Sequence, residues 1–267
     1  MGLGGFFCVD DTYQIYVNRV ARLTLPDTYQ SQLPLIQASP KFLGGQPQSF
    51  PGYSVITPPA QEDSLNASFY QSLTALQSQM AAEFSHWFCP VPPGSFHLTL
   101  ADLVWDAQYR SAIAENPNFE EALQNCVAQS FAQYQPSWPP EETVQWQSLG
   151  LVVFPRALGV ALVPRQEADY PPILQLRRSL YQNPQLIALG IEQQYHYTAH
   201  VTLGYFGEIP PNLSFAAIAE QLCHWNDQSL AQGPQILRIP QVELRYFADM
   251  TQFVRQAHYP VLHLKAR

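Results

Sequence analysis

SFHLTL at residues 95–100 and AHVTLG at residues 199–204 are near-copies of one another, and their histidines lie 103 residues apart (200 − 97). Each stretch reads His-x-Thr-Leu in an apolar context, which predicts a β-strand. Because residues i and i+2 of a strand point to the same face, each stretch places an imidazole beside a threonine hydroxyl. The repetition predicts two related halves, with His97, Thr99, His200 and Thr202 gathered at a shared site.

The paired motifs supply groups that can act on a phosphate without a metal. An imidazole titrates near neutral pH and can accept or donate a proton, and a threonine hydroxyl can donate to a phosphate oxygen. A single His-x-Thr arises easily by chance in a chain with seven histidines, but the same local sequence at equivalent places in two halves does not. We therefore expect His97 and His200 to be catalytic, and Thr99 and Thr202 to bind the phosphate.

With these residues the chain resembles the two-histidine (2H) phosphoesterase superfamily, which includes 2′,3′-cyclic phosphodiesterases and the so-called 2′,5′ RNA ligase proteins. The hallmark of that superfamily is His-x-Thr/Ser-x in each of two related lobes. The resemblance implies a bilobal fold, a central cleft and cyclic phosphodiesterase activity. Several members follow the second motif with a basic residue, where this chain has Leu203-Gly204. The flanking pieces resemble an uncharacterised bacterial branch at residues 50–55, 92–97 and 247–251.

Hydrophobic periodicity predicts that each half runs helix, motif strand, helix, paired strands. This order favours an α+β fold with internal duplication, in which two antiparallel sheets with outer helices flank a central cleft. The elements predicted for the first half are a helix over 63–87, the motif strand over 96–105, a helix over 118–134 and strands over 143–154 and 157–163. Those predicted for the second half are a helix over 172–181, the motif strand over 195–206, a helix over 212–225 and strands over 236–247 and 260–264.

The domain prediction is a single bilobal domain over residues 51–267, with one lobe over about 51–165 and the other over about 166–267. Residues 1–50 are interpreted as an N-terminal extension, in which a short helix is possible over residues 28–38.

Four further side chains are candidates for substrate contact. Strand alternation places Phe206 on the cleft side with His200, where its ring could stack on a nucleobase or belong to the core. Arg156 at the predicted hairpin turn and Arg245 on a late strand are candidate phosphate clamps, or else solvated. His196 is four residues before His200 and would face the same side of a continuous strand, so it lies either near the substrate or at the entrance of the strand. A zinc pair of His196 and His200 on a helix is rejected because the glutamate of His-Glu-x-x-His is absent.

Composition excludes several function classes. The four cysteines lack Cys-x-x-Cys spacing, so we expect no metal and no cofactor. A serine-hydrolase elbow, a Walker loop and a Rossmann fingerprint are all missing. A formal charge of −8 with two lysines disfavours long duplex nucleic acid and favours a small nucleotide or RNA-end phosphodiester as the partner. No apolar run approaches a membrane span, and we expect a monomer in the cytoplasm.

The sequence therefore predicts a metal-independent phosphodiesterase, with 2′,3′-cyclic phosphate as the leading substrate by resemblance. One histidine would act as base and the other as acid, and the sequence leaves open which is which. The alternatives are a nucleotide or RNA-end sensor that uses the same cleft without turnover, and a structural protein whose two motifs lie apart.

Overall fold

The computed structural model describes residues 11–84, 86–135 and 143–264, and its strands form a four-stranded sheet, a five-stranded sheet and a small hairpin. The strands are β1 Phe42–Leu43, β2 Gln46–Pro47, β3 Gly52–Ile56, β4 Phe88–Pro90, β5 Thr99–Trp105, β6 Val144–Val153, β7 Ala157–Pro164, β8 His200–Phe206, β9 Ile236–Ile239, β10 Gln241–Phe247 and β11 Val261–His263. The helices are α1 Tyr13–Arg22, α2 Pro26–Gln32, α3 Ala67–Glu83, α4 Asp106–Glu115, α5 Phe119–Gln133, α6 Tyr170–Tyr181, α7 Pro184–Ala188 and α8 Phe215–Ala231.

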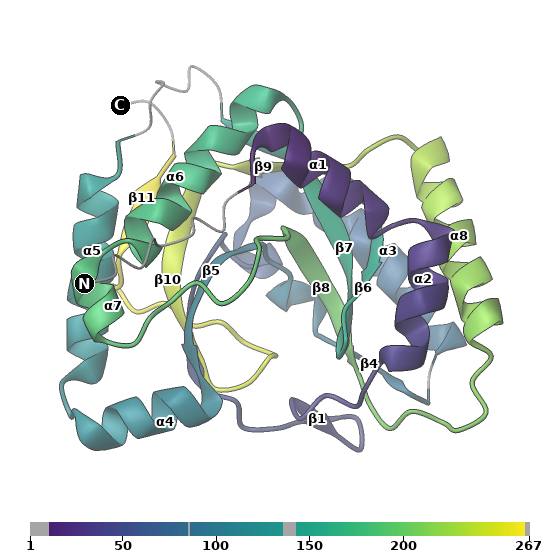
Figure 1. The fold of residues 1–267 in the computed structure, drawn as a ribbon, viewed down its shortest axis with the longest axis horizontal. Helices are drawn as coiled ribbons and strands as arrows, with labels where there is room; N and C mark the ends of the chain where they lie inside the picture. Colours follow the sequence, from purple (N-terminus) through teal and green to yellow (C-terminus); the bar gives the residue numbers. More distant parts are fainter. Residues whose placement is uncertain (1–10, 85, 136–142, 265–267) are drawn as a thin grey trace, which may run out of the picture.

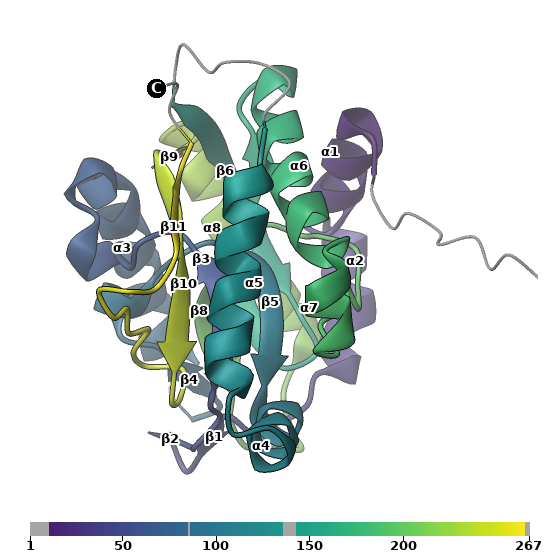
Figure 2. The ribbon, with the colours of Figure 1, turned by 90° about the vertical axis from the view of Figure 1, so that its left-hand side faces the viewer.

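The two large sheets are antiparallel throughout, as predicted for an α+β fold. Their strand orders are β11-β10-β3-β5 and β4-β8-β7-β6-β9, and they lie to the left and right of the centre in Figure 1. Helix α6 packs on β5 and α5 packs on β11, whereas α3, α8 and α1 pack on β4, β6 and β7 of the other sheet (Figure 2). One motif lies on a strand of each sheet, because β5 carries Thr99 and β8 carries His200 and Thr202.

Each sheet takes strands from both halves of the chain, so the sheets do not separate at the predicted lobe boundary near residue 165. The late strand β10 pairs with β3, and β4 pairs with β8. The hairpin β6–β7, expected in the first lobe, joins β8 through β7. An apolar pattern shows that a strand is paired, but it does not show with which partner.

The predicted strand over 236–247 is divided at Pro240, and its two parts belong to different sheets. β9 ends at Ile239 in the five-stranded sheet and β10 begins at Gln241 in the four-stranded one. Proline has no N–H for a sheet ladder, so the chain can change sheets there. Helices α1, α4 and α7 were not predicted, and the strand predicted from residue 195 begins only at His200.

The described part of the predicted N-terminal extension is built into the domain. Tyr16 of α1 and Tyr29 of α2 are 0% exposed. The Tyr16 hydroxyl donates to the Leu162 carbonyl at 2.9 Å and accepts from the Ala199 N–H at 3.1 Å. The Tyr29 hydroxyl donates to the Leu151 carbonyl at 2.6 Å. Residues 11–50 therefore cover β6, β7 and the approach to β8.

Strand β5 is the free edge of its sheet, and side chains satisfy its carbonyls. Tyr181 donates to the Asp102 carbonyl at 2.8 Å, Tyr197 donates to the Thr99 carbonyl at 3.4 Å, and Arg177 donates to the Leu100 carbonyl. Covering an edge in this way prevents it from pairing with another chain. It also fixes the strand that follows His97.

Cys8, Lys265 and prolines 136, 139 and 140 lie outside the described residues. Within the described ranges, no helix is long and apolar enough to cross a membrane.

Candidate active site

The two motif strands bring His97, Thr99, His200 and Thr202 to the wall of one cleft with a volume of about 910 Å³. The four residues come from both sheets, so the cleft lies where β5 and β8 approach one another. Ser95 and Thr198, each two residues before its histidine, also line it. The structure thus gathers the motif residues as the duplicated pattern predicted.

Both imidazoles are held by the same backbone contact. The Nδ1 atom of His97 is 2.7 Å from the Ser95 carbonyl, and the Nδ1 atom of His200 is 2.7 Å from the Thr198 carbonyl. A carbonyl only accepts, so Nδ1 carries the proton and donates in each case. Neutral imidazole has one donor and one acceptor nitrogen, which leaves Nε2 with a free lone pair on both rings. The two histidines are therefore equivalent proton acceptors.

Burial lowers the pKa of both imidazoles, and that of His97 falls to about 4. Smaller effects follow in each case: the Ser95 and Thr198 carbonyls and the Asp102 carboxylate raise the pKa values, and a charge on His200 lowers that of His97. Both rings are consequently neutral near pH 7 in the unliganded protein. A charge on His200 therefore makes protonation of His97 less favourable.

An aromatic ring packs on each histidine. The ring centroids of Phe253 and His97 lie 4.1 Å apart, and those of Phe154 and His200 lie 4.4 Å apart. Phe253 follows β10, whereas Phe154 lies at the turn between β6 and β7. These rings exclude water from one side of each imidazole, which contributes to the burial that lowers the pKa values.

A β-bulge in each motif strand changes which later residue enters the cleft. In β8, Thr202 pairs with Gly159 and Gly204 pairs with Leu158, so Leu203 has no partner of its own. The alternation shifts by one residue at such a bulge. As a result Tyr205 lines the cleft.

Phe206 is therefore not a cleft residue, contrary to the prediction from simple alternation. Its side chain is 0% exposed, and its ring packs in the core against Trp87 with 5.4 Å between centroids.

The equivalent bulge in β5 brings Asp102 into the cleft. Thr99 pairs with Ile56 and Ala101 pairs with Val55, which leaves Leu100 unpaired. Asp102 then follows His97 at the same spacing as Tyr205 follows His200 (102 − 97 = 5; 205 − 200 = 5). Ser54 Oγ donates to one carboxylate oxygen of Asp102 at 3.2 Å, and the Tyr195 hydroxyl donates to the other.

The basic side chains that line the cleft are Arg156 and Lys41. Arg156 is exposed at the turn between β6 and β7, where its guanidinium donates to Gln37 Oε1 at 3.3 Å. Lys41 precedes β1, and its ammonium lies 3.3 Å from the Tyr205 hydroxyl. Arg156 therefore lines the cleft, and Lys41 is a second basic residue of the lining that was not predicted.

Arg245 does not line the cleft, so the structure does not support its role as a phosphate clamp. It is 2% exposed, and its guanidinium pairs with Glu243 at 2.5 Å and with Glu62 at 2.6 Å. Its Nη1 atom also donates to the Phe253 carbonyl at 2.9 Å. Two carboxylates already neutralise this arginine. It holds the backbone of Phe253, whose ring packs on His97.

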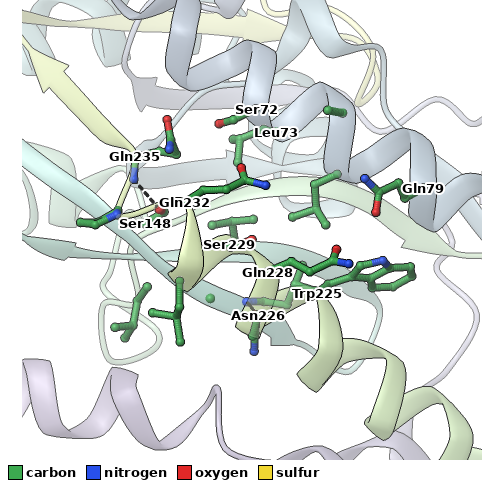
Figure 3. A pocket seen from close by; sticks show the side chains of 18 residues that line it. Ser72, Leu73, Gln79, Ser148, Trp225, Asn226, Gln228, Ser229, Gln232 and Gln235 are labelled. Atoms are coloured by element: carbon green, nitrogen blue, oxygen red, sulfur yellow. Dashed lines mark hydrogen bonds between the residues drawn. The ribbon is translucent and has the colours of Figure 1, made fainter.

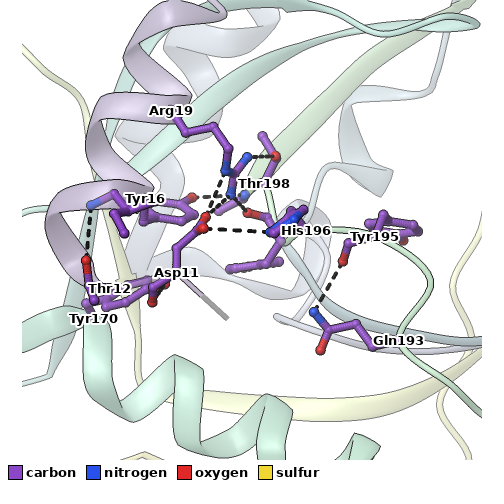
Figure 4. Close-up of polar contacts among 12 residues, drawn as sticks. Asp11, Thr12, Tyr16, Arg19, Tyr170, Gln193, Tyr195, His196 and Thr198 are labelled. Atoms are coloured by element: carbon purple, nitrogen blue, oxygen red, sulfur yellow. Dashed lines mark hydrogen bonds and ion pairs between the residues drawn. The ribbon is translucent and has the colours of Figure 1, made fainter. Parts of the chain in front are cut away.

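His196 lines the cleft from the loop before β8, and its ring lies next to Asp11 (Figure 4). Its Nδ1 atom is 3.7 Å from Asp11 Oδ1, and Asp11 also pairs with Arg19 at 2.8 Å. Arg19 donates to Thr198 Oγ1 at 2.8 Å and to the Tyr197 carbonyl at 2.5 Å. Arg19 of helix α1 therefore anchors the backbone segment whose Thr198 carbonyl accepts the hydrogen bond from His200 Nδ1–H, and His196 is at the edge of this cluster.

Gly204 explains why no basic residue follows the second motif. A Cβ at this position would lie 2.5 Å from the Phe88 ring and 2.6 Å from the Cys89 carbonyl. Strand β4 therefore leaves no room for any side chain here.

A second, smaller hollow of about 120 Å³ lies between α3, α8 and β6 (Figure 3). Its polar lining consists of amides and hydroxyls such as Gln79, Gln228 and Ser148, and none of its lining residues is ionisable. It offers no acid or base. Among residues 11–84, 86–135 and 143–264, no group of three His, Cys, Asp or Glu side chains is placed to hold a metal ion.

The cleft residues that the sequence did not predict were missed for two reasons. Asp102 and Tyr205 enter the cleft through bulges, which a strict alternation cannot show. Asp102 did carry a signal, since it is a charged residue within the apolar run LTLADLVW at residues 98–105. Lys41, Phe154 and Phe253 reach the cleft from loops, whose course no periodic pattern predicts.

No family model and no curated protein matches the sequence. Among solved structures, a conserved protein of unknown function from Agrobacterium tumefaciens aligns with a TM-score of 0.54 and 15% identity, over 85% of this chain and 90% of that chain. This chain shares the fold of that protein.

Other solved structures align with lower scores. LigT from Escherichia coli in its apo form has a TM-score of 0.42 at 16% identity, over 82% of this chain and 99% of that chain. Usb1 from Kluyveromyces marxianus has a TM-score of 0.36 at 11% identity, over 78% of this chain and 97% of that chain.

Proposed function

We propose that this chain is a metal-independent phosphodiesterase that acts on small nucleotide or RNA-end phosphodiesters, with 2′,3′-cyclic phosphates as the preferred class. The observation that supports this most is the equivalence of His97 and His200. Each donates Nδ1–H to the carbonyl two residues before it and presents Nε2 to the same cleft. Such a pair can place a base on one side of a phosphate and an acid on the other.

In the proposed reaction a water oxygen attacks phosphorus while one Nε2 atom accepts its proton. The bond from phosphorus to the departing ribose oxygen breaks in line, and the second imidazole gives that oxygen a proton. The product is a nucleoside 2′- or 3′-phosphate, and the pair has exchanged protonation states. Displacement at phosphorus depends on such positioning and on stabilising the equatorial oxygens. To the hydroxyls of Thr99 and Thr202, which line the same cleft, we assign the role of donating to those oxygens.

One imidazole must be protonated for this reaction, although burial makes both neutral in the unliganded protein. A bound phosphodiester carries a negative charge, and an opposite charge nearby raises the pKa of an imidazole. The Asp102 carboxylate acts in the same direction on both rings. Substrate binding would thus supply the acid form of one member of the pair.

The test is an activity screen of wild type, His97→Gln and His200→Gln against nucleoside 2′,3′-cyclic phosphates, 2′,5′-linked dinucleotides and RNA 3′ ends, with EDTA present. The matched control is His224→Gln, because His224 is exposed on α8 and does not line the cleft. We expect each cleft variant to lose roughly 10²- to 10⁴-fold in rate, and the control to lose none. Activity that vanishes in EDTA and returns with a divalent ion would refute the metal-independent reaction.

A nucleotide or RNA-end sensor without turnover is the second candidate. The lowered pKa values of both imidazoles favour it, because the free cleft holds no protonated acid at neutral pH. It predicts saturable binding of the same ligands, unchanged ligand on recovery, and weaker binding in Thr99→Val and Thr202→Val.

A further inference from the structure

Lys41 is held in the cleft by two aromatic rings. Its ammonium lies 4.8 Å from the ring centroid of Phe50, 4.8 Å from that of Tyr205 and 3.3 Å from the Tyr205 hydroxyl. Ser39 fixes the backbone, since its Oγ accepts from the Lys41 N–H at 3.2 Å. An ammonium has three donors, and the Tyr205 hydroxyl uses one of them. The charge is therefore positioned, with donors left for a ligand.

The charge on Lys41 has no carboxylate partner in the described part of the chain. The cations of the ion pairs found among these residues, such as Arg19, Arg110 and Arg245, do not include Lys41. Arg156, the other basic residue of the cleft lining, donates to the neutral amide of Gln37. A lysine held beside two rings without a counter-charge is able to receive an anion.

The charged residues of the cleft are separated by side. Lys41 lies against Tyr205 of β8, and Arg156 lies at the start of β7, so both are on the side of the five-stranded sheet. The carboxylate of Asp102 on β5 lies on the side of the four-stranded sheet. Asp106, at the start of the helix after β5, lies on the same side and is paired with Arg110 at 3.4 Å. An anionic group would be attracted to the first side and repelled by the second.

The side of the cleft that carries Lys41 and Arg156 is displaced along β8 from the His-x-Thr motif. Tyr205, which holds Lys41, lies two ladder positions beyond Thr202, because the two residues pair with Ala157 and Gly159 on β7. Two positions span about 7 Å at the rise of an extended strand. The reacting phosphate is assigned to the space between the threonines and the imidazoles. An anion at Lys41 is thus a second group of the same substrate, about one sugar away.

Accepting the proposed phosphodiesterase function, we propose that Lys41 and Arg156 form a subsite for a second phosphate of the substrate. The substrate class is then a 2′,3′-cyclic phosphate whose ribose also carries a phosphate on its 5′ oxygen. That phosphate is either a terminal 5′ phosphate of a mononucleotide or the internucleotide phosphate of an RNA 3′ end. A bare nucleoside 2′,3′-cyclic phosphate would leave the subsite without an anion.

The experiment measures binding of adenosine 3′-monophosphate and adenosine 3′,5′-bisphosphate by calorimetry to wild type, Lys41→Met and Arg156→Met. Methionine keeps the aliphatic stem and removes the charge. The control is Arg238→Met, because Arg238 is exposed on β9 and does not line the cleft. We expect wild type and control to bind the bisphosphate at least about tenfold more tightly, as for a charge-assisted hydrogen bond, and Lys41→Met to lose that preference.

Equal affinity of wild type for the two nucleotides would overturn the subsite, and so would a Lys41→Met variant that weakens both equally. Binding is measured without turnover, so a protein that shows the preference but hydrolyses nothing refutes the proposed reaction alone. A second arm compares uridine 2′,3′-cyclic phosphate, its 5′-phosphorylated form and a dinucleotide with a cyclic end. If only the 5′-phosphorylated form is hydrolysed faster than uridine 2′,3′-cyclic phosphate, the subsite is assigned to mononucleotides. If the dinucleotide is hydrolysed faster, the subsite is assigned to RNA ends.

Discussion

The ring of Phe253 lies 4.1 Å, centroid to centroid, from the imidazole of His97, and it is held there from behind. Arg245 donates to the Phe253 carbonyl at 2.9 Å and is itself fixed by Glu62 and Glu243. Arg245 was predicted to contact substrate, but it instead holds the loop whose Phe253 ring covers the candidate catalytic residue His97. The proton chemistry of the site depends on this packing as well as on the histidines.

The pH dependence should reflect the two lowered pKa values. The active free enzyme holds one proton on the pair, and both imidazoles release theirs below the usual value of 6.5. The basic limb of kcat/KM should therefore lie below pH 6.5, and the limbs of kcat should lie higher because the bound phosphate raises the pKa. Rates measured from pH 4 to 9 check this. A basic limb of kcat/KM above pH 7 would contradict the assignment.

Stability should also depend on His97. Between pH 6.5 and about 4 the unfolded chain binds a proton at this position and the folded chain does not, so stability falls as the pH falls. The loss reaches up to about 3 kcal/mol, at 1.36 kcal/mol for each pKa unit. Urea unfolding of wild type and His97→Gln at pH 7 and pH 4.5 measures it. The variant should lose less stability than wild type over this interval, and an equal loss in both proteins would count against a buried neutral imidazole.

Replacing Arg245 should lower the free energy of unfolding by more than replacing a surface arginine would. In Arg245→Leu the buried Glu243 loses its counter-charge, which typically costs about 3–5 kcal/mol. The Phe253 carbonyl also loses its donor, so the ring on His97 is less restrained and the basic limb of the pH profile should move up. Glu62→Gln is the control, since the Glu62 side chain is 46% exposed and its loss should cost less. Similar unfolding midpoints for the two variants would argue against this role.

Asp102 should set the position of the pH profile. Its carboxylate raises the pKa of both imidazoles, so Asp102→Asn removes a negative charge and should move both limbs to lower pH. Asn keeps an oxygen that can accept from Ser54 or Tyr195. Asp227→Asn, at an exposed position on α8, makes the same charge change away from the cleft and should leave the profile in place. A shift to higher pH in Asp102→Asn would reverse the sign of this argument.

The sequence was sufficient to predict the paired motifs and the two sheets, because both depend on short apolar patterns around His97 and His200. It was not sufficient beyond the bulges at Leu100 and Leu203, where one unpaired residue moves the side chains that follow it to the other face. Phe206 was misplaced for that reason alone. The positions of Lys41 and Arg245 depend on which distant segments meet, and that is decided by packing of the whole chain rather than by any local pattern.

The exchange of strands between the two halves governs the order in which the protein can form. β3 needs β10, which begins at Gln241, and β6 and β7 need β8, which begins at His200. A nascent chain that has emerged only to residue 165 contains neither sheet complete, and it must keep apolar strand edges from pairing wrongly until the last segments are made. Contacts of such long sequence separation slow folding. A fragment ending at residue 165 should therefore be insoluble on its own and should regain a folded cleft only when residues 166–267 are supplied in trans.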